Sequence, residues 1–195
     1  MIKTERAVKI LRDYAAVILI TASVALVIRL FVIEAYRVPS DFMAPGLSTG
    51  DLIFVSKLPY SLGRNKLPRR GAVIVFGLFS APGKEYLKRV IGLPGDRVSV
   101  HGGQLLVNGK AVTQGMDGGI SREALDDARY QVIWRQQDDM PEVLVPGGNL
   151  FVLGDNRDKG QDSRHWGFLP MGGIKGKAWL IWWSPDSARR FTRVN

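Results

Sequence analysis

The stretch Tyr36–Leu47, YRVPSDFMAPGL, separates two parts of the chain that have different hydrophobic patterns. A nearly uncharged apolar run ends just before it, and short segments rich in Val, Ile and Phe begin soon after it. Pro39 and Pro45 fix the backbone at two points and prevent a helix from continuing through the stretch. We therefore expect Tyr36–Leu47 to join a helical segment to a β domain.

The apolar run before this junction predicts a membrane anchor. Tyr14–Ile28 carries no charge, and counted through Arg29, whose stem can snorkel, the run 14–33 has 20 residues. A transmembrane helix needs about 20 residues. The basic segment 1–13 is expected to stay in the cytoplasm, which leaves the remaining chain outside. A cleaved secretory signal and a buried amphipathic helix are the alternatives, but no small-x-small cleavage site follows the run and its apolar character is nearly continuous.

The chain after the junction has the pattern of a mostly antiparallel β fold. Its apolar segments are short and are bounded by Gly, Pro and Asn-Gly turn signals. We expect a short helix over Ser121–Arg129, in a region rich in Gly and charge. The predicted strands are Asp51–Lys57, Gly71–Gly77, Glu85–Leu93, a meander over Arg97–Val112, Tyr130–Gln136, Asn149–Gly154 and Ile174–Trp183.

The composition excludes several classes of protein. The 195 residues suffice for one or two domains, and no cysteine is present, so disulfide scaffolds and thiolate sites are excluded. The net charge of +9 favours an anionic partner. Because no helix-turn-helix, zinc-finger or RNP-like pattern accompanies that charge, membrane lipid is the expected partner and nucleic acid is not.

Four stretches, taken together and in order, resemble the type I signal peptidases, which are membrane-bound Ser/Lys proteases that remove signal peptides. In the first, the family has Pro-Ser-x-Ser-Met-x-Pro-Thr-Leu. The last matches the family's Gly-Asp-Asn-Arg, Asp-Ser-Arg and Trp-Gly block almost throughout. The stretches are Pro39–Leu47, Gly50–Lys57, Lys88–Asp96 and Gly154–Pro170. The resemblance implies a β core of the catalytic type over 34–96 and 149–195, with a β subdomain inserted at 97–148.

The resemblance also implies a serine nucleophile and a lysine general base. Lys88 matches the base, and its apolar neighbours would lower the pKa of the amine by burial. The nucleophile is missing, because Phe42 stands where the family has its reactive serine. Ser40 matches a serine whose hydroxyl helps to stabilise the oxyanion in some members. It lies two residues from the nucleophile position, about 6 to 7 Å along an extended chain, which makes it a poor substitute nucleophile.

Two further departures lie in the same boxes. Gly160 replaces a small hydroxyl residue that helps to orient the lysine amine in the family, and Gly46 replaces the usual threonine. Ser163 is interpreted as structural. The charged residues of the last box are expected to brace the site through salt bridges; they are Asp155, Arg157, Asp158, Asp162 and Arg164.

These observations predict a signal peptidase homologue of the bacterial inner membrane, single-pass, with its C-terminal domain periplasmic or extracytoplasmic. We expect this copy to bind signal peptides, preproteins or other extended peptides by strand addition without cutting them. An active peptidase that uses Lys88 and Ser40 is one alternative, and a structural subunit of a membrane complex is another. Other secretion components are further candidate partners.

The remaining sequence features are less informative. No cofactor is expected, and His101 and His165 stand too far apart in the sequence to suggest a metal site. The aromatic residues of the C-terminal part are compatible either with a membrane-facing surface or with core packing; they are Trp166, Phe168, Trp179, Trp182 and Trp183. The arginines of the C-terminal tail are interpreted as a solvated face or as contacts to anionic lipid.

Overall fold

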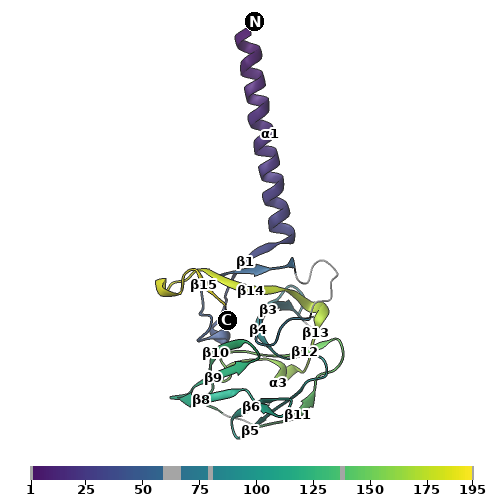
Figure 1. Cartoon of the computed structure of the whole chain (residues 1–195), viewed down its shortest axis with the longest axis vertical. Helices are drawn as coiled ribbons and strands as arrows, with labels where there is room; N and C mark the ends of the chain where they lie inside the picture. The colour runs from purple at the N-terminus through teal and green to yellow at the C-terminus, as the bar shows by residue number, and fades with distance from the viewer. Residues whose placement is uncertain (1, 59–66, 79–80, 137–138, 195) are drawn as a thin grey trace.

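The structure is a computed structural model that describes residues 2–58, 67–78, 81–136 and 139–194. Its largest feature by length is helix α1, Ile2–Phe31, which projects away from a β domain (Figure 1). The basic segment predicted at 1–13 therefore belongs to the same helix as the apolar run, although Met1 lies outside the described residues.

Among the described residues, no helix combines the length and the apolar character needed to cross a membrane. The anchor expected over residues 14–33 stays a prediction.

The described strands form three antiparallel sheets, which confirms the mostly antiparallel β class. The first sheet has the order β1-β2-β14-β3-β4-β12-β13, with β15 paired to β14. Its strands are β1 (Ile33–Arg37), β2 (Leu52–Ser56), β3 (Val73–Gly77), β4 (Glu85–Gly92), β12 (Asn149–Leu153), β13 (Leu169–Pro170), β14 (Ile174–Trp183) and β15 (Thr192–Arg193).

The two smaller sheets are built from the part of the chain between β4 and β12. One has the order β11-β5-β6-β7 and the other the order β10-β9-β8. Their strands are β5 (Arg97–His101), β6 (Gln104–Val107), β7 (Lys110–Ala111), β8 (Thr113–Asp117), β9 (Ile120–Leu125), β10 (Ala128–Ile133) and β11 (Met140–Leu144). The short helices are η1 (Asp41–Met43), α3 (Ser163–Trp166), η2 (Met171–Gly173) and η3 (Ser187–Arg189).

The helix predicted over Ser121–Arg129 is wrong. Strands β9 and β10 occupy this region as a hairpin, in which Leu125 pairs with Ala128. Burial alternates along β9, so that Ser121, Glu123 and Leu125 face inward, which is the period of a strand. Asp126 has a φ of 52°, which suits the tight turn between the strands. The sequence shows no apolar alternation here, because two of the inward-facing residues, Ser121 and Glu123, are polar although they are buried.

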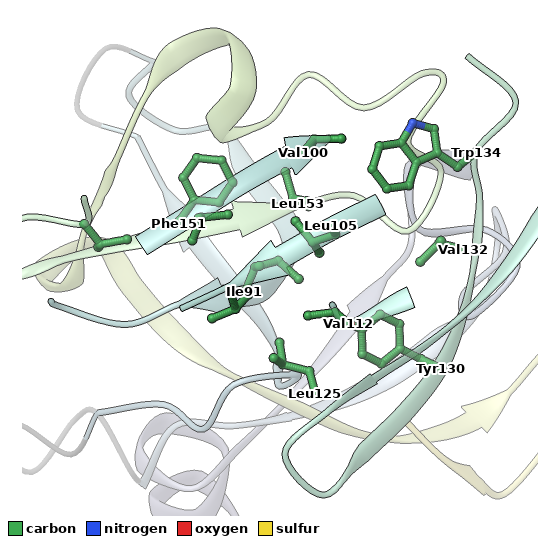
Figure 2. Close-up of a cluster of buried hydrophobic side chains, with 13 residues drawn as sticks. Ile91, Val100, Leu105, Val112, Leu125, Tyr130, Val132, Trp134, Phe151 and Leu153 are labelled. Atoms are coloured by element: carbon green, nitrogen blue, oxygen red, sulfur yellow. The ribbon is translucent and has the colours of Figure 1, made fainter. Parts of the chain in front are cut away.

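Three clusters of buried apolar side chains form the core. One joins the two smaller sheets to the first sheet; Trp134 and Tyr130 belong to it together with Phe151, Leu153 and Ile91 (Figure 2). A second cluster contains Val38, Met43 and Leu47 and so lies directly beneath the Tyr36–Leu47 junction. The junction is therefore anchored to the core and not a mobile connection.

The C-terminal aromatic residues differ in their exposure. Trp166 contacts the buried Phe76 ring, whereas Trp179 stacks on Phe54 and is 40% exposed. Trp183 is also exposed, and the Arg190 guanidinium lies over its ring.

Candidate functional site

The junction places Phe42 at the surface of the site. Ser40 has an extended backbone and precedes the single turn η1. Within that turn and just after it, Met43 and Leu47 are buried, with a Leu47 N–H to Met43 carbonyl hydrogen bond of 2.8 Å. The Phe42 side chain is 38% exposed, and the Phe42 carbonyl accepts a 3.0 Å hydrogen bond from the Asn156 N–H. The backbone at position 42 is thus held firmly against the loop that follows β12.

Lys88 on strand β4 lies opposite Phe42. Its side chain is almost fully buried, and its Nζ lies 4.9 Å from the centre of the Phe42 ring. Among the described residues, Nζ has no hydrogen-bond partner. Burial lowers the pKa of the Lys88 amine, and Arg164 acts in the same direction, whereas Asp162 and Asp155 oppose the shift. Folding therefore favours an uncharged amine, the form in which a lysine can accept a proton.

Phe42 and Lys88 share a pocket of about 280 Å³. Val38, Ser40 and Leu87 contribute to its walls. Ser40 thus lies at the same pocket as Lys88, but since Nζ has no hydrogen-bond partner among the described residues, Ser40 is not hydrogen-bonded to the amine. Among the described residues, no hydroxyl is hydrogen-bonded to the amine.

The loop after β12 approaches Lys88 through Gly154. A side chain at position 154 would lie 2.8 Å from the Phe42 carbonyl and 3.3 Å from Lys88 Nζ, so only glycine allows this close approach. The Gly154 N–H donates to the Asp162 carboxylate at 3.1 Å.

Asp162 organises the end of this loop. It is fully buried, and its carboxylate accepts hydrogen bonds of 2.9 Å from Nε and Nη2 of Arg164. It also caps helix α3 by accepting from the Arg164 N–H. A side chain at Gly160 would have its Cβ 2.7 Å from an Asp162 carboxylate oxygen. Gly160 therefore supplies no partner to Lys88, and the packing around it fits glycine.

Two buried ion pairs hold the loop that follows β12 in place. Arg89 donates to Asp155 through Nε at 2.7 Å and Nη2 at 2.6 Å. Arg157 donates to Glu123 through both Nη atoms, at 2.8 and 2.7 Å. All four groups are buried, so these bidentate pairs fix the loop relative to β4 and β9.

The other residues singled out in the sequence have supporting positions. Ser163 accepts a 3.0 Å hydrogen bond from the Val152 N–H and holds helix α3 to β12. Asp158 accepts from the N–H groups of Arg135 and Gln136 at the rim of the loop. Among the described residues, no group of three His, Asp or Glu side chains could hold a metal ion.

Several residues that shape the site were not singled out from the sequence, although Arg89, Asn156 and Lys159 lie within the matching stretches. Asn156 holds the Phe42 carbonyl, and Lys159 forms an exposed 2.7 Å ion pair with Asp41, beside Phe42. Arg89 follows Lys88 directly, which is a local signal. No local sequence signal indicated Glu123, because it lies 34 residues from its partner Arg157.

Comparisons with known proteins agree with this description. The profile of the family described as "Signal peptidase, peptidase S26" matches residues 11–183. Signal peptidase I of Bacillus caldolyticus is 38% identical to this chain over 164 residues, which cover 84% of this chain and 87% of that protein. Signal peptidase I of Pseudomonas aeruginosa is 34% identical over 198 residues, which cover 84% of this chain and 69% of that protein.

One solved structure is also similar, a signal peptidase I from Enterococcus faecalis V583. It is 27% identical, covers 57% of this chain and 97% of that chain, and has a TM-score of 0.41. The family assignment therefore rests on the sequence matches, which extend over most of the chain. They include both the turn η1, which contains Phe42, and the loop after β12. The chain belongs to the signal peptidase family, peptidase S26.

Proposed function

We propose that this member of the family binds signal peptides or similar extended segments without cleaving them. The observation that carries the proposal is the pairing of Phe42 with Lys88: a phenyl ring, which has no nucleophilic atom, lies 4.9 Å from the Lys88 Nζ. The peptide would lie along the pocket that Phe42, Ser40 and Lys88 share. Extended peptides bind such sites through backbone hydrogen bonds to a strand and through side-chain pockets.

The state of Lys88 supports binding without catalysis. A general base must hold a hydrogen bond to the group that it deprotonates, or reach it through one water. Among the described residues, the amine has no such partner, and Gly160 adds no hydroxyl beside it. The aromatic ring covers the amine instead, and it fills space in which a small substrate side chain would otherwise fit.

We also propose that α1 attaches the domain to the bacterial inner membrane, with the β domain on the outer side. Large apolar side chains along the helix are exposed, among them Tyr14, Leu19 and Phe31, and no charge occurs between Tyr14 and Ile28. In water this exposed surface would be unfavourable, and a bilayer would cover it. Alkaline carbonate extraction of bacterial membranes tests this part of the proposal: release into the soluble fraction would contradict it.

A cleavage assay separates binding from catalysis. The full chain in detergent is incubated with a preprotein, beside Ser40→Ala, Phe42→Ser and the double variant Phe42→Ser/Gly160→Ser. We expect no product from the unmodified protein. Product that disappears in Ser40→Ala would sink the proposal in favour of an active peptidase with Ser40 as nucleophile. Product from a variant that carries Phe42→Ser supports it, because that change alone restores a hydroxyl opposite Lys88.

A binding assay tests the peptide site itself. Fluorescence anisotropy of a labelled signal peptide is measured with the unmodified chain and with Ser40→Arg, which places a bulky charge at the pocket. Thr49→Arg is the matched control, because Thr49 is an exposed residue of the same loop that does not line the pocket. We expect Ser40→Arg to weaken binding and Thr49→Arg to leave it unchanged. Equal affinities for all three proteins would place the peptide elsewhere.

A further inference from the structure

A second pocket lies between the loop after Pro45 and strand β10, and it has a volume of about 190 Å³. Gly46, Leu47, Arg129, Gln131 and Arg193 are among the residues that line it. It shares no lining residue with the pocket that contains Phe42 and Lys88. Figure 1 shows the C-terminal end of the chain close to β10, in agreement with the presence of Arg193 in the lining.

Among the described residues, the pocket has positive charge that no acidic side chain compensates. The Arg129 guanidinium donates to the backbone carbonyls of Asp126 and Ala128, at 2.8 and 3.2 Å, and to no carboxylate of the described residues. Arg193 likewise forms no ion pair within the described part of the chain. Two arginines of the pocket lining therefore have no acidic partner among the described residues.

The carboxylate nearest to Gly46 does not neutralise them. A Cβ on Gly46 would lie 2.8 Å from an oxygen of Asp155. Asp155 is already bound on both oxygens by Arg89, so that pair is neutral as a unit. Gly46 also keeps the floor of the pocket open, because any side chain there would press against the pair.

The edge of strand β10 supplies backbone donors on the same side. β10 is an edge strand that pairs only with β9 in its sheet. The Ile133 N–H donates to the Asp155 carbonyl at 2.9 Å, so the N–H of this residue points away from β9. Backbone direction repeats every second residue in a strand, and the N–H groups of Gln131 and Arg129 therefore point to the same side.

Tyr130 also lines the pocket, and the Arg89 guanidinium lies over its ring, 3.9 Å from the ring centre. Its hydroxyl is buried and has no hydrogen-bond partner among the described residues. Burial raises the pKa of the Tyr130 hydroxyl well above its ordinary value, so the group keeps its proton at neutral pH. Because this hydroxyl is buried, the donors that a ligand could reach are the arginine side chains and the strand-edge N–H groups.

We propose that this pocket binds a phosphate group. Arginines from two different strands, together with strand-edge N–H groups, line a small volume, which suits a tetrahedral anion with several oxygens. Two positive charges match the charge of a phosphate monoester. Leu47 and Val194 give the pocket an apolar side where the carbon group of an ester would lie. The phosphate comes either from a lipid headgroup or from a soluble phosphate compound.

Titration calorimetry of the full chain in dodecyl maltoside tests the proposal with two probes, inorganic phosphate and dihexanoyl phosphatidic acid. We expect the unmodified protein to bind, and Arg129→Gln and Arg193→Gln each to weaken binding about 10- to 100-fold, the range for one lost hydrogen bond to a charged group. Arg122→Gln is the matched control, because Arg122 is an exposed arginine on β9 outside the pocket.

The two probes distinguish the sources of the phosphate. Tighter binding of the phosphatidic acid identifies a lipid headgroup, and equal binding of both probes identifies a soluble phosphate; both outcomes support the site. Absence of binding by both probes would overturn it. A loss in Arg122→Gln as large as in the pocket variants would also overturn it, because the effect would then follow net charge and not position.

Discussion

Asp155→Asn is the substitution for which the structure makes the sharpest stability prediction. It keeps the shape of the side chain and removes its charge. Arg89 and Asp155 have side-chain exposures of 2% and 0%, and the guanidinium donates to both carboxylate oxygens. A guanidinium stays protonated in proteins. The variant would therefore hold a buried cation that has lost the charge of the Asp155 carboxylate, and the new amide would direct an N–H toward the N–H groups of Arg89.

The size of the effect follows from the burial of the pair. Removal of one partner of a buried ion pair lowers the free energy of unfolding by about 3 to 5 kcal/mol. At about 2 to 4 °C per kcal/mol for a protein of this size, Tm should fall by about 6 to 20 °C. The control is Glu142→Gln, which removes a 2.6 Å pair with Arg97 whose side chains are 45% and 60% exposed. An exposed pair contributes about 0 to 1 kcal/mol, so Tm should fall by at most about 4 °C.

Calorimetry and urea unfolding of the full chain, in one detergent, measure both variants. A decrease for Asp155→Asn no larger than that for Glu142→Gln would refute the argument that burial determines the cost. The double variant Arg89→Met/Asp155→Asn provides a second check. It removes the buried cation together with the carboxylate that it binds, so it should be more stable than the sum of the two single changes predicts. Strict additivity would show that the two side chains do not interact.

Three further predictions concern the site and the core. Lys88→Met should raise the free energy of unfolding at neutral pH. Burial lowers the pKa of the Lys88 amine in the folded protein, so protonation of this amine destabilises the fold. This destabilisation is complete below the folded-state pKa and fades as the pH rises toward the unfolded-state pKa of about 10.4. Urea unfolding from pH 6 to 10 should show a pH slope in the unmodified protein that the variant lacks, and parallel curves would contradict this. Gly160→Ala should lower the free energy of unfolding by about 1 to 3 kcal/mol, because its Cβ would lie 2.7 Å from a carboxylate oxygen. The control Gly147→Ala, whose Cβ would have no atom within 4 Å, should change it by less than about 0.5 kcal/mol. Equal changes in the two variants would rule out the clash. Trp134→Ala should cost about 3 to 5 kcal/mol in the same unfolding assay, because only 1% of the side chain is exposed; a cost below about 1 kcal/mol would contradict its place in the core.

Local sequence was sufficient for most of the strands and for the key position of the site. The strands at Leu52–Ser56, Glu85–Gly92 and Ile174–Trp183 were predicted nearly to their ends, because apolar β-branched runs and turn residues report directly on a pleated backbone. Phe42 was singled out through the resemblance of Pro39–Leu47 to the family's first box, without any structure. The same local evidence failed at Ser121–Leu125, where the inward-facing residues include polar ones.

The tertiary structure alone decided the environment of Lys88 and the partners of the charged loop. The sequence placed Lys88 among apolar neighbours, but the loss of its solvent depends on the loop after β12 and on Phe42, which come from other parts of the chain. Glu123 and Arg157 pair across 34 residues, and the second pocket combines Gly46, Arg129 and Arg193. Residue type and spacing determine which element a segment forms, whereas desolvation and charge pairing depend on which distant segments fold against it, and local sequence does not encode that.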